Sequence, residues 1–292
     1  QNLGGHSLRR GDITTARYLY QQGLEISKEL GDKNGVSKSL YGLGMLAHYT
    51  GNYDEAHNLY QQSLKINQEQ GDKSVVSMSL HQLGILAIDT GDYDAARRFF
   101  QQSLEIKQEL DDKIGMASSL NQLGTLAQIT DDYDAARNFV QQSLELRKEI
   151  SDKSGMSKSL HNLGDLVAAA GEYDEARNYY QQSLEICEQL GDKSGVAGLL
   201  HQLGNLAYRT GDYDTARKLY QPSLEIAQQL GDKKCIALSQ AQLALLEEKM
   251  GNVKAALNLI HQAEIIFREL RSPFAEQAKR DRQRLEQNQR RG

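Results

Sequence analysis

Three histidines stand at the same place of a sequence repeat and are the first candidates for chemistry. His81, His161 and His201 lie 80 and 40 residues apart, and imidazole is the side chain that most often binds transition metals or moves protons near neutral pH. A zinc site needs ligand atoms about 2 Å from the metal, whereas stacked helices lie about 10 Å apart. No Cys, His or carboxylate spacing completes a ligand set. We therefore expect no metal and no cofactor, and interpret these histidines as polar groove residues.

No residues typical of an enzyme accompany the histidines. The sequence contains no nucleophile elbow, no phosphate-binding glycine loop and no paired-carboxylate motif. Cys187 and Cys235 have no motif spacing, which is typical of free buried thiols in a reducing cytosol. We predict a cytoplasmic protein that is not an enzyme.

Charge and hydropathy argue against two classes of partner. The 292 residues carry a net charge of −5, whereas nucleic-acid binding rests on an excess of Lys and Arg. No apolar run approaches the roughly 20 residues that a membrane helix needs. The basic run at residues 279–284 is interpreted as part of a solvated capping helix. We expect no nucleic acid and no membrane among the partners.

A repeat of 40 residues explains why the histidines recur. Residues 191–230 and 71–110 are identical at 26 of 40 positions without a gap. A period of about 20–50 residues is typical of a solenoid. We predict a solenoid over residues 1–270 and a polar capping helix with a tail over 271–292. The expected repeats are 1–30, which is truncated, 31–70, 71–110, 111–150, 151–190, 191–230 and 231–270. Because residues 1–4 enter the frame in mid-helix, we expect the chain to be a fragment of a longer protein.

Each repeat carries two apolar patterns of helical period and no strand pattern. The first pattern has steps of four, three and four: Val36, Leu40, Leu43 and Ala47. The second pattern is one stripe of a further helix: Ala56, Leu59, Tyr60, Ser63 and Leu64. Between them, Gly51 favours a left-handed turn and Asp54 favours the start of the next helix. These features predict an all-α fold of helix pairs.

Glycines inside the first helix indicate a close contact between the two helices of each pair. Glycine costs about 1 kcal/mol of helix propensity relative to alanine, yet one position keeps it in five copies: Gly44, Gly84, Gly124, Gly164 and Gly204. The second helix has a matching column of small residues: Ala16, Ala56, Ala96, Ala136, Ala176, Ala216 and Ala256. We expect the paired helices to cross closely where glycine meets alanine.

The residues Leu203-Gly204, Ala216 and Tyr220 resemble the pattern of the tetratricopeptide repeat. The large aromatic residue expected early in the first helix is Leu200 here, and the usual terminal proline is absent. The 40-residue length is similar to repeats of Pins-type adaptors, kinesin light chains and bacterial regulatory arrays. The resemblance implies a right-handed superhelical α-solenoid of about seven antiparallel helix pairs with a C-terminal capping helix.

The family resemblance also implies that the first helices line a concave groove. Positions 38, 41, 45 and 48 fall on one helix face, and their residues differ from copy to copy. Such variation on a repeated framework is expected where recognition is encoded, although an unused surface would vary in the same way. The predicted partner-binding residues are Lys38, Tyr41, Met45, His48, His81, Gln82, Ile85, Asn121, Gln122, Thr125, Lys158, His161, Asn162, Asp165, His201, Gln202, Asn205, Tyr208 and Arg209.

A column of amides precedes the leucine of each Leu-Gly pair and has two interpretations. Its members are Gln82, Gln122, Asn162, Gln202 and Gln242. Amides donate and accept at once, which suits gripping the backbone of a bound peptide. They would equally bridge neighbouring helices or face water.

Two functions follow from these features. The first is a non-catalytic scaffold that binds a peptide or helix of a partner protein in the groove, as the sensor or adaptor part of a larger regulatory protein. The alternative is a structural solenoid that associates end to end with copies of itself.

Overall fold

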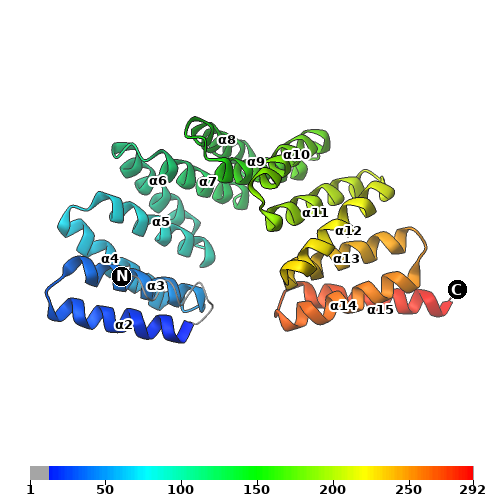
Figure 1. Ribbon diagram of the computed structural model, residues 1–292, viewed down its shortest axis with the longest axis horizontal. Coiled ribbons are helices and arrows are strands. Elements are labelled where there is room, and N and C mark those ends of the chain that lie inside the picture. The colour runs from blue at the N-terminus through cyan, green and yellow to red at the C-terminus, as the bar shows by residue number, and fades with distance from the viewer. Residues whose placement is uncertain (1–12, 292) are drawn as a thin grey trace. The chain divides into compact units, whose positions relative to one another are not determined.

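The computed structural model describes residues 13–291, which form fourteen α-helices and no strand (Figure 1). The predicted all-α class is therefore confirmed, while residues 1–4, on which the prediction of a truncated first repeat rests, lie outside the described part. The helices are α2 (Ile13–Glu29), α3 (Lys33–Tyr49), α4 (Tyr53–Gln70), α5 (Lys73–Asp89), α6 (Tyr93–Glu109), α7 (Lys113–Ile129), α8 (Tyr133–Glu149), α9 (Lys153–Ala169), α10 (Tyr173–Leu190), α11 (Lys193–Arg209), α12 (Tyr213–Leu230), α13 (Lys233–Lys249), α14 (Val253–Glu269) and α15 (Phe274–Arg291).

The chain divides into two compact units, and the boundary in the sequence falls between Ser151 and Asp152. Unit 1 contains α2 to α8, and unit 2 contains α9 to α15. Within each unit, successive helices joined by short turns pack side by side as hairpins (Figure 1). The first helices of neighbouring repeats also touch, since α5 contacts α7 in unit 1 and α11 contacts α13 in unit 2. Each unit thus has one face built from adjacent first helices.

Left-handed turns follow the helices at the glycines where the sequence predicted such turns. Gly51 and Gly91 have φ of 77° and 80°, values that a residue without a side chain adopts easily. Asp92 then caps α6 by accepting a hydrogen bond of 3.0 Å from the backbone N–H of Ala95. Four turns use another residue in the same conformation: Asp111, Asp131, Ser151 and Arg271.

The helix glycines do mark close contacts, but their main partner differs from the predicted one. A Cβ built on Gly84 would lie 2.6 Å from the ring of Phe100, and one on Gly124 would lie 2.6 Å from Cγ2 of Val140. At Gly124 the alanine column also comes near, through the backbone oxygen of Ala136 at 3.3 Å. The glycine therefore makes room for a large buried side chain of the second helix.

Helix α15 closes the C-terminal end of unit 2 through ion pairs as well as apolar contacts. Arg282 Nε donates to Glu264 Oε2 at 2.7 Å, and the Glu264 carboxylate is itself buried. Arg284 pairs with Glu248 of α13. Arg282 and Arg284 of this helix are thus paired with carboxylates of α13 and α14. Within residues 13–291, no helix has the length and apolar character needed to cross a bilayer.

Candidate recognition surface on the first helices

The predicted partner-binding residues lie on the first helices of each unit, and we call the surface that they form on a unit its first-helix face. Most of these residues are partly covered by their own chain. Lys38, Lys158 and Arg209 are exposed. The remaining predicted residues are half-buried: Tyr41, Met45, His48, His81, Gln82, Ile85, Asn121, Gln122, Thr125, His161, Asn162, Asp165, His201, Gln202, Asn205 and Tyr208. The contacts beneath them come from the second helices.

A single position of the second helix supports this face in every complete repeat, and sequence reasoning did not include it in the site. We call it the ring position, and each occupant is at most 2% exposed: Tyr60, Phe100, Val140, Tyr180, Tyr220 and Ile260. In the five repeats that have a helix glycine, the glycine leaves space for this side chain. Its recurrence every 40 residues is visible in the sequence, but its contact with the first-helix face appears only in three dimensions.

The three histidines pack against the ring position and do not project freely from the face. The ring centroid of His81 lies 5.4 Å from that of Phe100, and that of His201 lies 5.5 Å from that of Tyr220. Burial lowers the pKa of both histidines from 6.5 to about 4, and at His81 the positive charge of Lys107 acts in the same direction. Both side chains are therefore neutral at pH 7.

In unit 2, polar residues of the face form one hydrogen-bonded network. Asp165 Oδ1 accepts from the Tyr180 hydroxyl at 2.5 Å and from Gln202 Nε2 at 2.9 Å. Asn205 Nδ2 donates to Gln202 Oε1 at 2.8 Å, and Asn205 Oδ1 accepts from the Tyr220 hydroxyl at 2.7 Å. The network links α9, α10, α11 and α12. In this copy the amide of Gln202 bridges neighbouring helices, which was one of the two interpretations of the amide column.

His161 and Arg209 lie beside this network. His161 Nε2 lies 3.6 Å from Asp165 Oδ2. Burial and the negative charge of Asp165 raise the pKa of Tyr180, while the nearby positive charge of Arg209 opposes that shift. The Tyr180 hydroxyl consequently stays protonated and serves as a donor.

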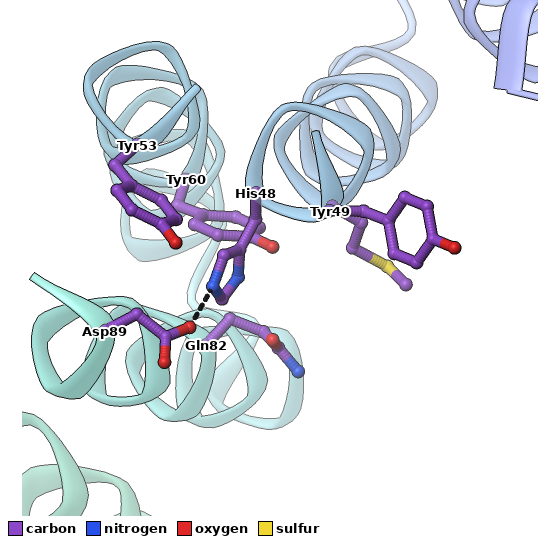
Figure 2. A pocket seen from close by; sticks show the side chains of 7 residues that line it. His48, Tyr49, Tyr53, Tyr60, Gln82 and Asp89 are labelled. Carbon is purple, nitrogen blue, oxygen red and sulfur yellow. Dashed lines mark hydrogen bonds and ion pairs between the residues drawn. The ribbon is translucent and has the colours of Figure 1, made fainter. Parts of the chain in front are cut away.

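In unit 1, the same face contains a hollow of about 340 Å³, which we call the Tyr60 pocket (Figure 2). Its walls come from α3, α4 and α5: Met45, His48, Tyr49, Tyr53, Tyr60, Gln82 and Asp89. His48 lies at its centre and its Nε2 is 2.6 Å from Asp89 Oδ2, which ties α3 to α5. The Tyr60 hydroxyl is buried and has no hydrogen-bond partner. Of these seven residues, the sequence predicted Met45, His48 and Gln82 for the site and missed the others.

The sequence comparison that decides the family covers nearly the whole chain. The profile described as Tetratricopeptide repeat matches residues 1–69, 75–149, 115–189, 155–206 and 195–269. The chain belongs to the tetratricopeptide repeat family. Members of this family are typically non-catalytic scaffolds. No curated protein sequence is similar enough to be matched.

Several solved structures share the fold of this tetratricopeptide repeat chain. The apo form of RapI is 18% identical with a TM-score of 0.72, over 92% of this chain and 96% of RapI. A Rap protein complexed with Competence and Sporulation Factor is 14% identical with a TM-score of 0.63, over 93% of this chain and 85% of the Rap protein. A signal transduction ATPase with numerous domains from Pyrococcus horikoshii, with a tetratricopeptide repeat sensor, is 15% identical with a TM-score of 0.76. In that pair the similarity covers 95% of this chain and 42% of the ATPase.

The tetratricopeptide repeats present no cluster of metal-ligating residues in the part that the structure describes. No group of three or more His, Cys, Asp or Glu side chains is placed to hold a metal ion. The two cysteines are free, with Cys187 buried and Cys235 half-buried. The side chains of the first-helix face offer hydrogen bonding, charge pairing and contact with aromatic rings.

Proposed function

We propose that this chain is a non-catalytic scaffold whose first-helix face binds an extended peptide or a helix of a partner protein. The observation that carries the proposal is that the face varies between copies while the ring position beneath it stays buried in all of them. A constant support under variable side chains is the arrangement expected of a surface that encodes specificity.

The mechanism that fits these contacts is preorganisation. Binding is weakened when side chains must be ordered on contact with the partner. In unit 2, Asp165, Gln202 and Asn205 are already held by hydrogen bonds. A partner would meet polar atoms in fixed positions, with exposed Arg209 beside them.

Two of the similar structures support this role and a place in a larger regulatory protein. One is a Rap protein in complex with Competence and Sporulation Factor, and the other is an ATPase with a tetratricopeptide repeat sensor. By analogy with them, we propose that the chain is the sensor or adaptor part of such a protein. This parentage rests on similarity of fold.

Selection of a displayed library of random 15-residue peptides tests the scaffold role. We expect enriched peptides whose affinity falls at least about fivefold when Lys38 and Arg209 are both changed to Ala, because charged groups at a binding face contribute about 1 kcal/mol or more each. Fluorescence polarisation of the enriched peptides measures the affinity.

The matched control changes two exposed lysines of the second helices, Lys65→Ala and Lys218→Ala. It removes the same number of positive charges from the other side of the helix pairs. Equal losses in the two double variants, or no enriched peptide at all, would contradict recognition by the first-helix face.

A further inference from the structure

The Tyr60 hydroxyl lacks the partner that its counterparts in unit 2 possess. Tyr180 and Tyr220 donate to the residue fifteen positions earlier, which is Asp165 in one case and Asn205 in the other. The residue fifteen positions before Tyr60 is Met45, whose thioether is a weak acceptor at best. The Tyr60 side chain is fully buried, and no side chain or backbone group in the described part of this structure accepts from or donates to its hydroxyl. A buried polar group without a partner is unfavourable and points to a ligand that supplies one.

The walls of the Tyr60 pocket are suited to a long side chain with a flat, polar end. Tyr49 and Tyr53 are exposed aromatic rings at its rim, at 72% and 39% exposure, and Met45 adds a polarizable thioether. Figure 2 shows the hydroxyl of Tyr60 and the amide of Gln82 on the same side of the His48 ring. An apolar stem can lie along such rings while its end reaches oxygen atoms deeper in the pocket.

The negative charge of the pocket wall favours a ligand with a positive charge. Asp89 is the carboxylate in the wall, and its side chain is 44% exposed beside His48. The equivalent residue of the other complete repeats is not acidic: Tyr49, Ile129, Ala169, Arg209 and Lys249. An anionic group would be repelled by Asp89, whereas a cation would be attracted and would stack on the tyrosine rings.

We propose that the Tyr60 pocket binds an arginine side chain presented by a partner peptide. The guanidinium is planar, carries five N–H donors and stacks on aromatic faces. It can donate to the Asp89 carboxylate and to the Gln82 oxygen at the pocket wall, and a shift of the side chains over Tyr60 would bring that hydroxyl within its reach. Lysine offers a compact ammonium without the planar fork, and leucine or methionine would leave the Tyr60 hydroxyl unpaired. This inference rests on the proposed function, because the pocket is part of the first-helix face.

The pocket is specific to this copy of the repeat. In the next repeat of unit 1, the corresponding positions hold Phe100 and Ile85, which have neither a hydroxyl group nor an acceptor. In unit 2, the hydroxyl groups of Tyr180 and Tyr220 are already bonded within the chain. We therefore expect one arginine to be bound by unit 1 at this position.

The test uses the blocked tripeptide acetyl-Gly-Arg-Gly-amide and its citrulline and lysine analogues as probes. The chain contains five methionines, so ¹³C-labelled methyl groups report binding at Met45 while the other four serve as internal controls. We expect a saturable shift of the Met45 methyl signal with the arginine peptide, with a Kd near the millimolar range. The citrulline peptide, which has the same shape without the charge, should bind at least about tenfold more weakly.

Two variants and one control locate the binding atoms. Asp89→Asn should weaken the arginine peptide about tenfold, since it removes the charge and keeps an oxygen near His48. Tyr60→Phe should weaken it about threefold to fivefold by removing the hydroxyl alone. Tyr220→Phe makes the same chemical change in unit 2 and should leave the affinity unaltered. Equal binding of the arginine and citrulline peptides, or no Met45 shift up to about 20 mM, well above a millimolar Kd, would overturn the inference.

Failure of the arginine site can be distinguished from failure of the proposed scaffold function. If the arginine peptide fails while library peptides still bind in a manner that depends on Lys38 and Arg209, the pocket inference is wrong and the scaffold role stands. If the arginine peptide binds at Met45 but no library peptide is enriched, the arginine site stands and the scaffold role is wrong.

Discussion

The two units place the same buried tyrosine under the first-helix face and use it in opposite ways. In unit 2, Tyr180 and Tyr220 are bonded to Asp165 and Asn205, and the polar atoms of the face satisfy one another. In unit 1, Tyr60 faces Met45 and a hollow of about 340 Å³ remains. The backbone framework is shared between these repeats. The difference lies in the first-helix residue fifteen positions before the tyrosine, which is Asp165 or Asn205 in unit 2 and Met45 in unit 1.

The largest effect is expected from breaking the framework that both units share. In Gly124→Leu, the first added atom would lie 2.6 Å from Val140 Cγ2 and 3.3 Å from the oxygen of Ala136. Overpacking of this kind costs about 3 kcal/mol, and more where the backbone is the neighbour. Urea unfolding followed by circular dichroism measures the loss of stability.

The matched control for this substitution is Gly198→Ala in α11. Apart from its chain neighbours and the backbone of its own helix, no atom lies within 4 Å of the position of its Cβ, and alanine favours a helix interior over glycine by about 1 kcal/mol. We expect Gly198→Ala to be neutral or stabilising. If Gly124→Leu were tolerated as well as this control, the close contact at the helix glycines would be disproved.

A smaller loss of stability is expected when the pH is lowered. It concerns both units, because His81 lies in unit 1 and His201 lies in unit 2. Burial lowers the pKa of each from 6.5 to about 4, so the unfolded chain binds these protons more readily than the folded chain between those values. Stability present above pH 6.5 is therefore lost as the pH falls toward 4. Each imidazole should contribute of the order of 1–2 kcal/mol to this loss.

Replacement of one histidine isolates its share of the pH dependence. His81→Asn introduces the amide that the chain itself uses at Asn121, the equivalent position of the next repeat. Unfolding midpoints at pH 7, 5.5 and 4.5, spanning the range between the two pKa values, should fall less steeply for this variant than for the unaltered chain. Identical slopes would show that His81 does not couple folding to protonation.

The smallest change in stability is expected from removal of a tyrosine hydroxyl, and it compares the bonded Tyr220 of unit 2 with the unbonded Tyr60 of unit 1. Tyr220→Phe removes a hydroxyl that donates to Asn205, and this should cost about 1 kcal/mol. Tyr60→Phe removes a buried hydroxyl without a partner, so we expect it to be neutral or slightly stabilising. Thermal unfolding of the two variants provides the comparison. A larger loss for Tyr60→Phe would show that its hydroxyl is already paired in solution.

Much of the fold could be predicted from the sequence because its determinants are local and repeated. The turns at Gly51 and Gly91, the capping Asp92 and the 40-residue period all depend on residues close together in the chain. The identity of the surface residues on the first helices was also accessible, since helical spacing fixes which side chains share a face.

The chemistry of the site was less accessible because its contacts span distant residues. The bond from Tyr180 to Asp165 crosses 15 residues, and that from Gln202 to Asp165 crosses 37. Repeat periodicity relates equivalent residues but does not show which positions touch. For the same reason the histidines were expected as polar groove residues, whereas the structure packs His81 and His201 against buried rings.

The origin of the pocket residues has a consequence for how such arrays diversify. Met45 and Tyr60 belong to one repeat, while Gln82 and Asp89 belong to the next. Duplication of a single repeat would copy the unpaired hydroxyl but would place it beside whichever acidic, neutral or basic residue its new neighbour supplied at the position of Asp89. Gain or loss of ligand charge would then occur by shuffling whole repeats, with no point mutation in the residues that shape the cavity.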